Sequence, residues 1–216
     1  KVPALAIFGA ERDYLEWVIF FTGLLCFAAA ALLGLFLAWR LGAAGSSGEG
    51  GWGLLALGAV GLAGGYFYTG EPFNYKRRGL GVPFVFVLMG PMMIAGSYLA
   101  LAGVLRPAVF WIGIPLSALI AHILLCNEIR DYEYDREHGL RTLSSRIGMP
   151  RAKFLSFLLL AVGYLGPVIL HLARLFPHLW FVFLALPFAV RPMRTMRSPP
   201  AERAVIIPAI MLHHLV

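Results

Sequence analysis

The 216 residues are 60% hydrophobic and only 13% charged, with a mean hydropathy of +0.79. In a soluble domain about a quarter of the residues are charged, so this composition excludes a water-soluble fold and predicts an integral membrane protein. The net charge of +7 does not call for nucleic acid, because basic loops beside membrane helices are attracted to anionic lipid headgroups.

Six apolar runs follow one another along the chain, and several have about the 20 residues that a membrane-spanning helix needs. They lie at residues 17–39, 52–68, 82–105, 108–126, 154–172 and 178–190, and a seventh run at 204–216 is too short to cross. Four runs contain proline, which packed membrane helices tolerate as a kink, at Pro91, Pro115, Pro167 and Pro187. No stretch alternates with the period of a barrel strand. The sequence therefore predicts an all-α, polytopic transmembrane helix bundle that forms one domain over residues 1–216.

The basic residues indicate how the runs are oriented. If the runs alternate in direction, the N-terminal segment and the connectors 69–81, 127–153 and 191–203 share one face. That face holds all the Lys and Arg residues except Arg40, Arg106 and Arg174, and all the acidic residues except Glu49. Such an imbalance in short loops predicts that this face is cytoplasmic, in a bacterial cytoplasmic membrane.

Two kinds of buried group are expected inside the apolar runs. An ionisable group within a membrane span is rare, and we interpret His122 as a buried, hydrogen-bonded core histidine. Cys26 and Cys126 lie at different expected depths, so we expect no disulfide and interpret both as small buried side chains.

Carboxylates gather after the fourth run. Five of the eleven acidic residues lie between positions 128 and 137. If the helix continues past Cys126, then Asn127, Asp131 and Asp135 are each rotated by about 40° and displaced by about 6 Å from the one before. They therefore share one face, and Gly139 is a natural stop for such a helix.

Carboxylates in the last turns of a helix oppose its dipole, so we expect a positive group beside them. Mg²⁺ is suited to this position, because it takes oxygen ligands and is commonly shared between one or two carboxylates and a substrate phosphate. The alternative is a solvated helix end at which Arg130, Arg136 and Arg141 pair with the acids at helical spacing.

The segment N-x-x-x-D-x-x-x-D, which runs into HGLRTLSSRIG, resembles the second aspartate-rich motif of the UbiA superfamily of intramembrane prenyltransferases. The resemblance is greatest to the 1,4-dihydroxy-2-naphthoate polyprenyltransferases of menaquinone synthesis. Upstream, GYFYTGEPFNYKRRGLG followed by FVFVLMGPMMIAGSYLAL is similar to the loop and helix that precede this motif in those enzymes. The similar region covers residues 60 to 150.

The resemblance implies a bundle of nine helices in which two aspartate motifs face each other and hold Mg²⁺ on the diphosphate of a prenyl donor. In that family the second motif follows the sixth helix, whereas here it follows the fourth run. The resemblance thus implies that seven of nine helices are present, without the first two and part of the last. Glu11, Asp13 and Glu16 do not reproduce the spacing of the first motif, so we expect the chain to be inactive alone.

The resemblance also implies roles for individual residues. Asp131 and Asp135 would be the catalytic metal ligands, Asn127 would ligate or orient the metal, and Glu128 is a weaker candidate at the substrate. Basic residues expected to contact the diphosphate are Lys76, Arg77, Arg78 and Arg141, although the first three also fit an ordinary cytoplasmic anchor. Aromatic rings that could steady the allylic cation include Tyr68 and Tyr134, with Tyr66 and Tyr132 beside them. For Tyr132 and Tyr134 the alternative is the aromatic belt of a membrane interface.

The expected function is the transfer of a polyprenyl chain from polyprenyl diphosphate to an aromatic acceptor, 1,4-dihydroxy-2-naphthoate, with Mg²⁺ as cofactor. The alternative within the superfamily is another acceptor, such as 4-hydroxybenzoate or homogentisate. The CDP-alcohol phosphotransferases also use aspartate motifs at a membrane surface, but their D-G-x-x-A-R opening is absent. Outside the enzymes, a transporter or membrane scaffold is the competing hypothesis, and it predicts no requirement for a divalent metal.

Overall fold

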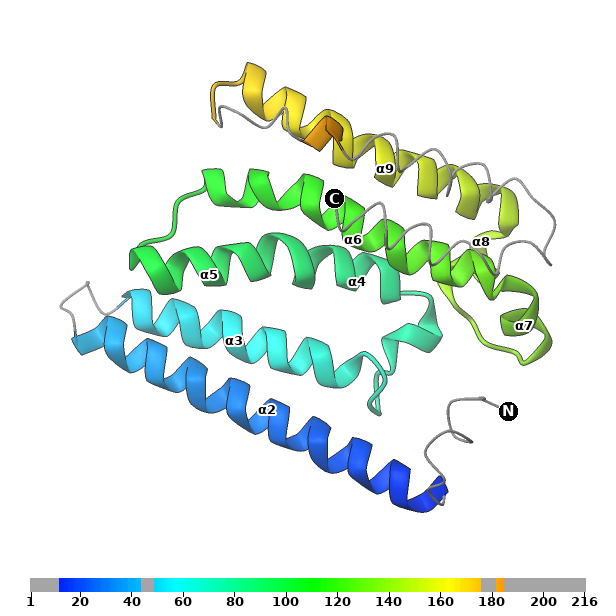
Figure 1. The fold of residues 1–216 in the computed structure, drawn as a ribbon, viewed down its shortest axis with the longest axis horizontal. Coiled ribbons are helices and arrows are strands. Elements are labelled where there is room, and N and C mark those ends of the chain that lie inside the picture. Colours follow the sequence, from blue (N-terminus) through cyan, green and yellow to red (C-terminus); the bar gives the residue numbers. More distant parts are fainter. Residues whose placement is uncertain (1–11, 44–48, 176–181, 185–216) are drawn as a thin grey trace.

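The computed structural model describes residues 12–43, 49–175 and 182–184, and every regular element in these ranges is helical (Figure 1). Five segments are long and apolar enough to cross a membrane, namely Trp17–Gly42, Gly50–Phe67, Gly81–Ala102, Ala108–Arg130 and Met149–Leu172. These segments correspond to the first five predicted runs, so the predicted all-α membrane bundle is confirmed. The runs expected at 178–190 and 204–216, including Pro187, lie outside the described residues except for 182–184.

The long elements are α2 (Arg12–Ala43), α3 (Glu49–Phe67), α6 (Ala108–Arg130) and α9 (Met149–Leu172). A composite third span consists of α4 (Gly81–Val87), the π-helical turn η2 (Leu88–Met92) and α5 (Met93–Ala102). The connections hold three short helices: η1 (Tyr75–Arg78), α7 (Tyr132–Glu137) and α8 (Leu143–Ile147).

The spans pack in chain order, with α2 on α3, α3 on α5, the composite span on α6, and α6 on α9 (Figure 1). Successive spans run in opposite directions, so the loop after α3 lies at the same end as α7 and α8 (Figure 1). The central helix α6 supplies much of the core, where Ala118, Ala121, Leu125 and Ile129 are fully buried. This arrangement brings the η1 loop next to the acidic end of α6.

Small residues let the composite span approach α6 closely. A Cβ atom on Gly113 would lie 2.7 Å from Cα of Pro91, and one on Gly90 would overlap the side chain of Ser117. Helices in a membrane gain most of their packing energy where backbones come this near. The Ser117 hydroxyl donates instead to the carbonyl of Gly113 within its own helix, at 2.6 Å.

The prolines lie within helical spans, as predicted. Pro91 lies in the π-helical turn η2, where the absence of its N–H is accommodated by a locally wider helix. Pro115 and Pro167 lie inside α6 and α9.

A buried polar cluster joins α6 to α9 and confirms the interpretation of His122. This histidine is 2% exposed, and its Nδ1 lies 3.0 Å from Oγ of Ser156 and 3.1 Å from the Ser156 carbonyl oxygen. Cys126 is buried beside it, with Sγ 3.6 Å from the Ser156 hydroxyl. The expected burial of Cys26 is wrong, because α2 lies at the edge of the bundle and leaves this side chain exposed. Both cysteines are free.

Candidate functional site

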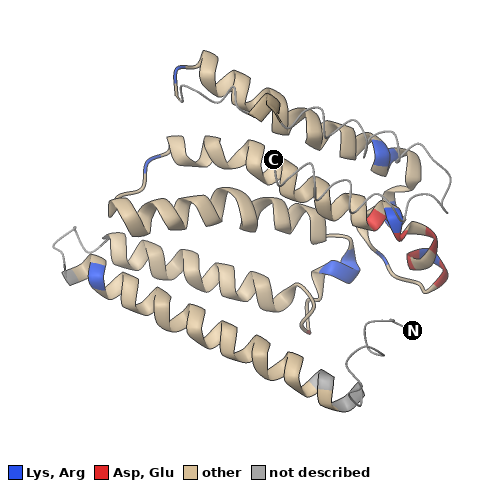
Figure 2. Ribbon diagram, in the orientation of Figure 1, with Lys and Arg blue, Asp and Glu red and all other residues tan. Residues whose placement is uncertain are grey.

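Charged residues concentrate at the end of the bundle that carries α7 and α8 (Figure 2). At the other end, Arg40 lies in the last turn of α2, Arg106 between α5 and α6, and Arg174 just after α9. Between the η1 loop and the end of α6 this charged end contains a pocket of about 560 Å³, which we call the polar pocket. Its lining includes Tyr68, Asn74, Lys76, Arg77, Asn127, Glu128, Arg130, Asp131, Asp135 and Thr142. The structure therefore brings together seven of the residues that the sequence singled out: Tyr68, Lys76, Arg77, Asn127, Glu128, Asp131 and Asp135.

The helix that carries the acidic motif differs from the expected one. α6 ends at Arg130, and Asp131 leaves the helical region with φ −89° and ψ 8° before α7 begins at Tyr132. A continuous helix would place all five carboxylates at its negative end, whereas the break puts Glu133 and Asp135 in the first turn of a new helix. Backbone hydrogen bonds between residues four apart are still made across the break. The Asp131 N–H donates to the Asn127 carbonyl at 3.0 Å, and the Asp135 N–H donates to the Asp131 carbonyl at 2.8 Å. Asn127, Asp131 and Asp135 thus still line one pocket.

Asp135 is the more enclosed of the two motif aspartates, with 7% of its surface exposed. Its Oδ2 accepts a hydrogen bond from the Thr142 hydroxyl at 3.0 Å. Burial raises the pKa of Asp135 above its ordinary value, the Thr142 hydrogen bond opposes that rise, and the charge of Asp131 adds to it. A cation placed in the pocket would relieve this cost of holding a carboxylate out of water.

Asp131 is less enclosed and already has a cationic partner. Arg130 donates to both of its carboxylate oxygens in a fork-to-fork ion pair. The alternative of a helix end with several ion pairs at helical spacing holds only in part. Arg130 pairs with its neighbour in sequence, while Arg136 bonds the Tyr132 hydroxyl at 3.4 Å.

Glu128 has a visible structural task. Its Oε2 accepts the backbone N–H of Ser144 at 2.9 Å, and the Ser144 hydroxyl donates to the Glu128 carbonyl at 3.1 Å. These bonds attach the start of α8 to the end of α6. The Glu128 carboxylate therefore satisfies an N-terminal amide of α8, while the N-cap residue Thr142 makes no side-chain cap bond and reaches Asp135 instead.

The cationic side of the polar pocket comes from η1. Lys76 and Arg77 line the pocket, and Nζ of Lys76 lies 5.8 Å from the centre of the Tyr68 ring. Arg78 is not among the lining residues, because its Nη2 turns back to donate to the Pro72 carbonyl at 2.8 Å.

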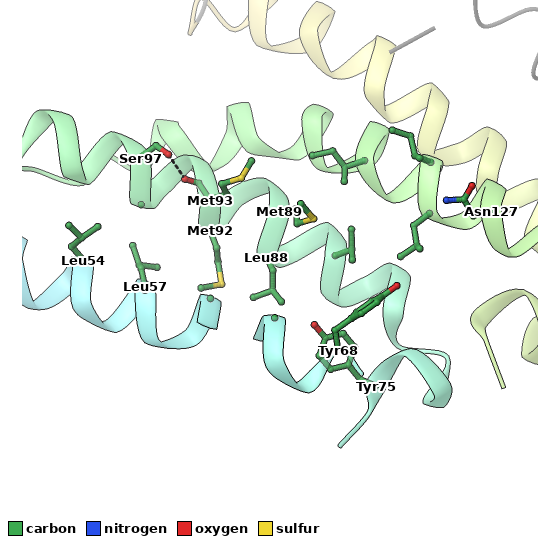
Figure 3. Close-up of a pocket in the computed structure, with 18 residues that line it drawn as sticks. Leu54, Leu57, Tyr68, Tyr75, Leu88, Met89, Met92, Met93, Ser97 and Asn127 are labelled. Atoms are coloured by element: carbon green, nitrogen blue, oxygen red, sulfur yellow. Dashed lines mark hydrogen bonds between the residues drawn. The ribbon is translucent and has the colours of Figure 1, made fainter. Parts of the chain in front are cut away.

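A second, apolar pocket of about 750 Å³ adjoins the polar pocket and shares Tyr68, Leu124 and Asn127 with it. Figure 3 shows Tyr68, Tyr75 and Asn127 at one end of this apolar pocket and Leu54, Leu57 and Ser97 at the other. Leu88, Met89, Met92 and Met93 line the space between them, together with Gly58, Gly61, Gly65 and Gly96. A charged pocket and an apolar pocket thus lie side by side, with three lining residues in common.

Tyr68 lines both pockets, and Tyr75 lines the apolar pocket beside it. The rings of Tyr68 and Tyr75 lie 5.4 Å apart edge to face, and Tyr75 stacks on Phe84 at 4.4 Å. The Tyr75 hydroxyl donates to the Gly64 carbonyl. Burial raises the pKa of Tyr68, and the nearby Glu128 and Tyr75 raise it further, so the phenol stays neutral. Sequence reasoning missed Tyr75, whose only signal was its place in the aromatic segment YFYTGEPFNY.

Two further predicted site residues lie apart from the polar pocket. Tyr134 is 58% exposed and stacks on His138 with ring centres 3.9 Å apart. Arg141 lines a different pocket, together with Arg136 and Arg146. Both residues are close to Asp135 in sequence, but neither lines the polar pocket.

The polar pocket offers oxygen ligands of the kind that Mg²⁺ prefers. Within the described ranges no three His, Cys, Asp or Glu side chains converge to form a metal cage. Asp131, Asp135 and Asn127 nevertheless offer oxygen donors to one space, next to the cations Lys76 and Arg77. This donor set fits Mg²⁺ held by one or two carboxylates and completed by phosphate oxygens and water.

Fold and site together define a membrane protein in which a pocket lined by both carboxylates and basic side chains adjoins an apolar pocket. The model of the UbiA prenyltransferase family matches residues 15–215, and the chain belongs to that family. The resemblance first seen in the aspartate-rich motif is thereby confirmed.

Individual relatives agree with the family. The chain is 34% identical over 146 residues to the 1,4-dihydroxy-2-naphthoate octaprenyltransferase of Bacillus subtilis (strain 168). The aligned region covers 66% of this chain and 46% of that protein. It is 34% identical over 157 residues to the enzyme of the same name from Mycobacterium tuberculosis, covering 71% and 52%. The human UbiA prenyltransferase domain-containing protein 1 is 34% identical over 105 residues, covering 49% and 31%. The chain spans about half the length of the first two relatives. No solved structure matches it.

Proposed function

We propose that the protein transfers a polyprenyl chain from polyprenyl diphosphate to 1,4-dihydroxy-2-naphthoate and releases diphosphate. The observation that carries the proposal is the junction of the two pockets, because a polyprenyl diphosphate has one anionic head and one long apolar tail. The head fits the pocket that contains Lys76, Arg77, Asp131 and Asp135, and the tail fits the apolar pocket beyond Tyr68.

In this reaction the bond between the diphosphate oxygen and the first carbon of the prenyl chain breaks, and that carbon bonds to the acceptor ring. The acceptor loses its carboxylate as carbon dioxide, and diphosphate leaves with the electron pair of the broken bond. Mg²⁺, when bound, would neutralise the departing diphosphate. Asp131 and Asp135 would hold it, with Asn127 as a further oxygen ligand or an orienting group.

The chain's own groups would act on both charges that develop. Lys76 and Arg77 would stabilise the growing negative charge of the diphosphate, because they line the same pocket as the aspartates. Tyr68 lines both pockets and Tyr75 lies against it, and a ring face there would attract the allylic cation by about 0.5–2 kcal/mol. Arg78, Tyr134 and Arg141 have no part in this proposal, because they do not line the polar pocket.

The choice of acceptor is supported by the names of the bacterial relatives. The protein would work in a bacterial cytoplasmic membrane with the polar pocket facing the cytoplasm, which is the side that the excess of basic loop residues favours. A second acceptor class, 4-hydroxybenzoate or homogentisate, stays the alternative within the family.

The test is prenyl transfer by the full-length protein in membranes, measured with labelled polyprenyl diphosphate and each acceptor in turn. Asp131→Asn and Asp135→Asn should each lower the rate by at least about a hundredfold, because they remove the charge that holds the metal. Chelation of divalent cations should do the same to the wild type, and Arg106→Gln at the opposite end should leave the rate unchanged. Full transfer in both aspartate variants, or after chelation, would contradict the proposed role of the aspartates and the metal. Absence of transfer to every acceptor by the wild-type protein would instead favour the transporter or scaffold hypothesis.

A further inference from the structure

The charged end of the bundle holds a second polar hollow, separate from the one that contains the aspartates. It measures about 400 Å³ and is lined by Arg136, Gly139, Leu140, Arg141, Ser145 and Arg146. We call it the arginine pocket. Its three arginines come from α7, from the loop after α7 and from α8, and all three are exposed. Leu140 is the one residue that it shares with the polar pocket.

The arginine pocket carries positive charge without a matching negative charge. No carboxylate lines it, and within the described part of the chain none of the three arginines forms an ion pair with Asp or Glu. Guanidinium groups gathered around one hollow repel each other, and an anion bound between them would remove that repulsion. The Ser145 hydroxyl donates to the carbonyls of Leu140 and Thr142 at 2.8 and 2.9 Å, so anion recognition falls to the arginines.

Two of the three guanidinium groups are already held in position. Nε of Arg146 donates to the Arg141 carbonyl at 3.3 Å. The side chain of Arg146 also packs against Gly79, because a Cβ atom added to Gly79 would lie 2.9 Å from the same Nε. Arg136 bonds the Tyr132 hydroxyl at 3.4 Å, and its guanidinium carbon lies 5.7 Å from the centre of that ring. Each group has five N–H donors, so most of its donors stay available to a ligand.

The chemistry and the position of the pocket together indicate its ligand. Guanidinium groups bind phosphate through paired, parallel hydrogen bonds, and several of them favour a phosphate over a single carboxylate. The pocket is formed by residues that follow the span Ala108–Arg130 and precede the span Met149–Leu172, so spans of this length would place it near the lipid headgroups. We propose that the arginine pocket binds the phosphate group of an anionic phospholipid. This inference does not depend on prenyl transfer.

The experiment uses the full-length protein in nanodiscs made of phosphatidylcholine with added phosphatidylglycerol, and native mass spectrometry counts the phosphatidylglycerol that each protein retains. The first variant is Arg141→Gln, because the Arg141 side chain makes no hydrogen bond in the described part of the chain and its loss should not disturb folding. The second is Arg141→Gln combined with Arg146→Gln. Arg151→Gln is the matched control, since Arg151 is exposed near the same end but lies outside the pocket.

We expect the double variant to retain phosphatidylglycerol about tenfold more weakly than the wild type, the single variant to be intermediate, and the Arg151 variant to be unchanged. Arg141→Lys should also bind more weakly, because an ammonium keeps the charge but loses the paired geometry. A parallel arm adds inorganic phosphate to nanodiscs of phosphatidylcholine alone. If inorganic phosphate binds there in an arginine-dependent way and phosphatidylglycerol is not selectively retained, the lipid proposal is overturned. The pocket would then be a site for soluble phosphate. Equal retention in all variants, or an equal loss in the Arg151 control, would overturn the site.

Discussion

At the scale of single residues, the loop between α7 and α8 distributes its hydrogen bonds in an unusual way. Thr142 occupies the N-cap of α8, a position at which a threonine hydroxyl ordinarily accepts an amide of its own helix. Here Glu128 accepts the Ser144 amide from across the pocket, and the Thr142 hydroxyl donates to Asp135. Because Thr142 does not cap its own helix, its hydroxyl can hold one carboxylate oxygen of Asp135 through a buried hydrogen bond.

Thr142 is therefore a positioning residue for the proposed metal site. Replacing it with valine keeps the shape of the side chain but removes the hydrogen bond to Asp135. We expect the Mg²⁺ concentration needed for half-maximal transfer to rise about 10- to 100-fold, as is typical when a partner of a metal ligand is lost. Titration of the rate with Mg²⁺ measures the effect, and the acceptor KM should stay nearly constant. Thr142→Ser keeps the hydroxyl and serves as the control, so equal Mg²⁺ requirements in the two variants would count against the role.

At the scale of elements, the break at Asp131 and the close approach of η2 to α6 shape the site. The break separates an apolar, membrane-spanning helix from a short charged one. The close approach sets the distance between α6 and the composite span, and both of these elements line the apolar pocket. Glycines at the contact permit that distance, because a Cβ on Gly113 would meet the Pro91 backbone and one on Gly90 would overlap the Ser117 side chain.

Gly113→Ala should destabilise the bundle by about 1–3 kcal/mol, the usual cost of overpacking, because its new methyl group would come within 2.7 Å of the Pro91 backbone. Gly96→Ala is the matched control, since Gly96 is also in a membrane helix and its Cβ would meet nothing within 4 Å. Both substitutions raise helix propensity alike, so only the steric contact differs. Thermal unfolding in detergent compares the two. If both variants unfold at the same temperature, α6 and η2 do not approach each other as the structure shows.

At the scale of the whole molecule, α3, the composite span, α6 and the η1 loop line two adjoining pockets, one charged and one apolar. α3 contributes Gly58, Gly61 and Gly65 to the apolar pocket, and a Cβ on either of the first two would point into open space. The width of the apolar pocket therefore depends on residues that have no side chain, opposite a wall of leucine and methionine (Figure 3).

Gly58→Leu should narrow the apolar pocket, because Gly58 lines it and a Cβ at this position would point into open space. A long polyprenyl donor should then bind less well, with KM raised about tenfold, because its tail loses buried contact with the pocket. A short donor such as geranyl diphosphate should be used as before, since its tail would not reach Gly58. Gly23→Leu on α2 is the control, because its side chain would also meet open space but outside the pocket. An equal loss with both donors would indicate that the tail lies elsewhere.

Much of this organisation could be predicted from the sequence, for local physical reasons. Hydropathy depends on composition within about 20 residues, so the five spans could be recognised without knowing their neighbours. The common face of Asn127, Asp131 and Asp135 could likewise be predicted from their spacing of four residues. The prediction holds because backbone hydrogen bonds between residues four apart continue across the break in the helix. Lys76 and Arg77 could be placed at the same end as the aspartates from the alternation of the spans.

Tertiary structure alone decided which neighbours in sequence become neighbours in space. Arg141 and Tyr134 adjoin the motif along the chain yet lie outside its pocket, because α7 and the loop after it turn their side chains elsewhere. Tyr75 bonds the Gly64 carbonyl back on α3, and Thr142 bonds Asp135 across the turn between α7 and α8. These contacts depend on how the chain turns between its helices, which hydropathy and helical spacing do not encode. The sequence determined a membrane bundle with a charged, acidic-motif end, because apolarity and helical spacing are properties of short segments. The packing of α6 against its neighbours decided which of those charges share a pocket, because that depends on how long-range contacts place the loops.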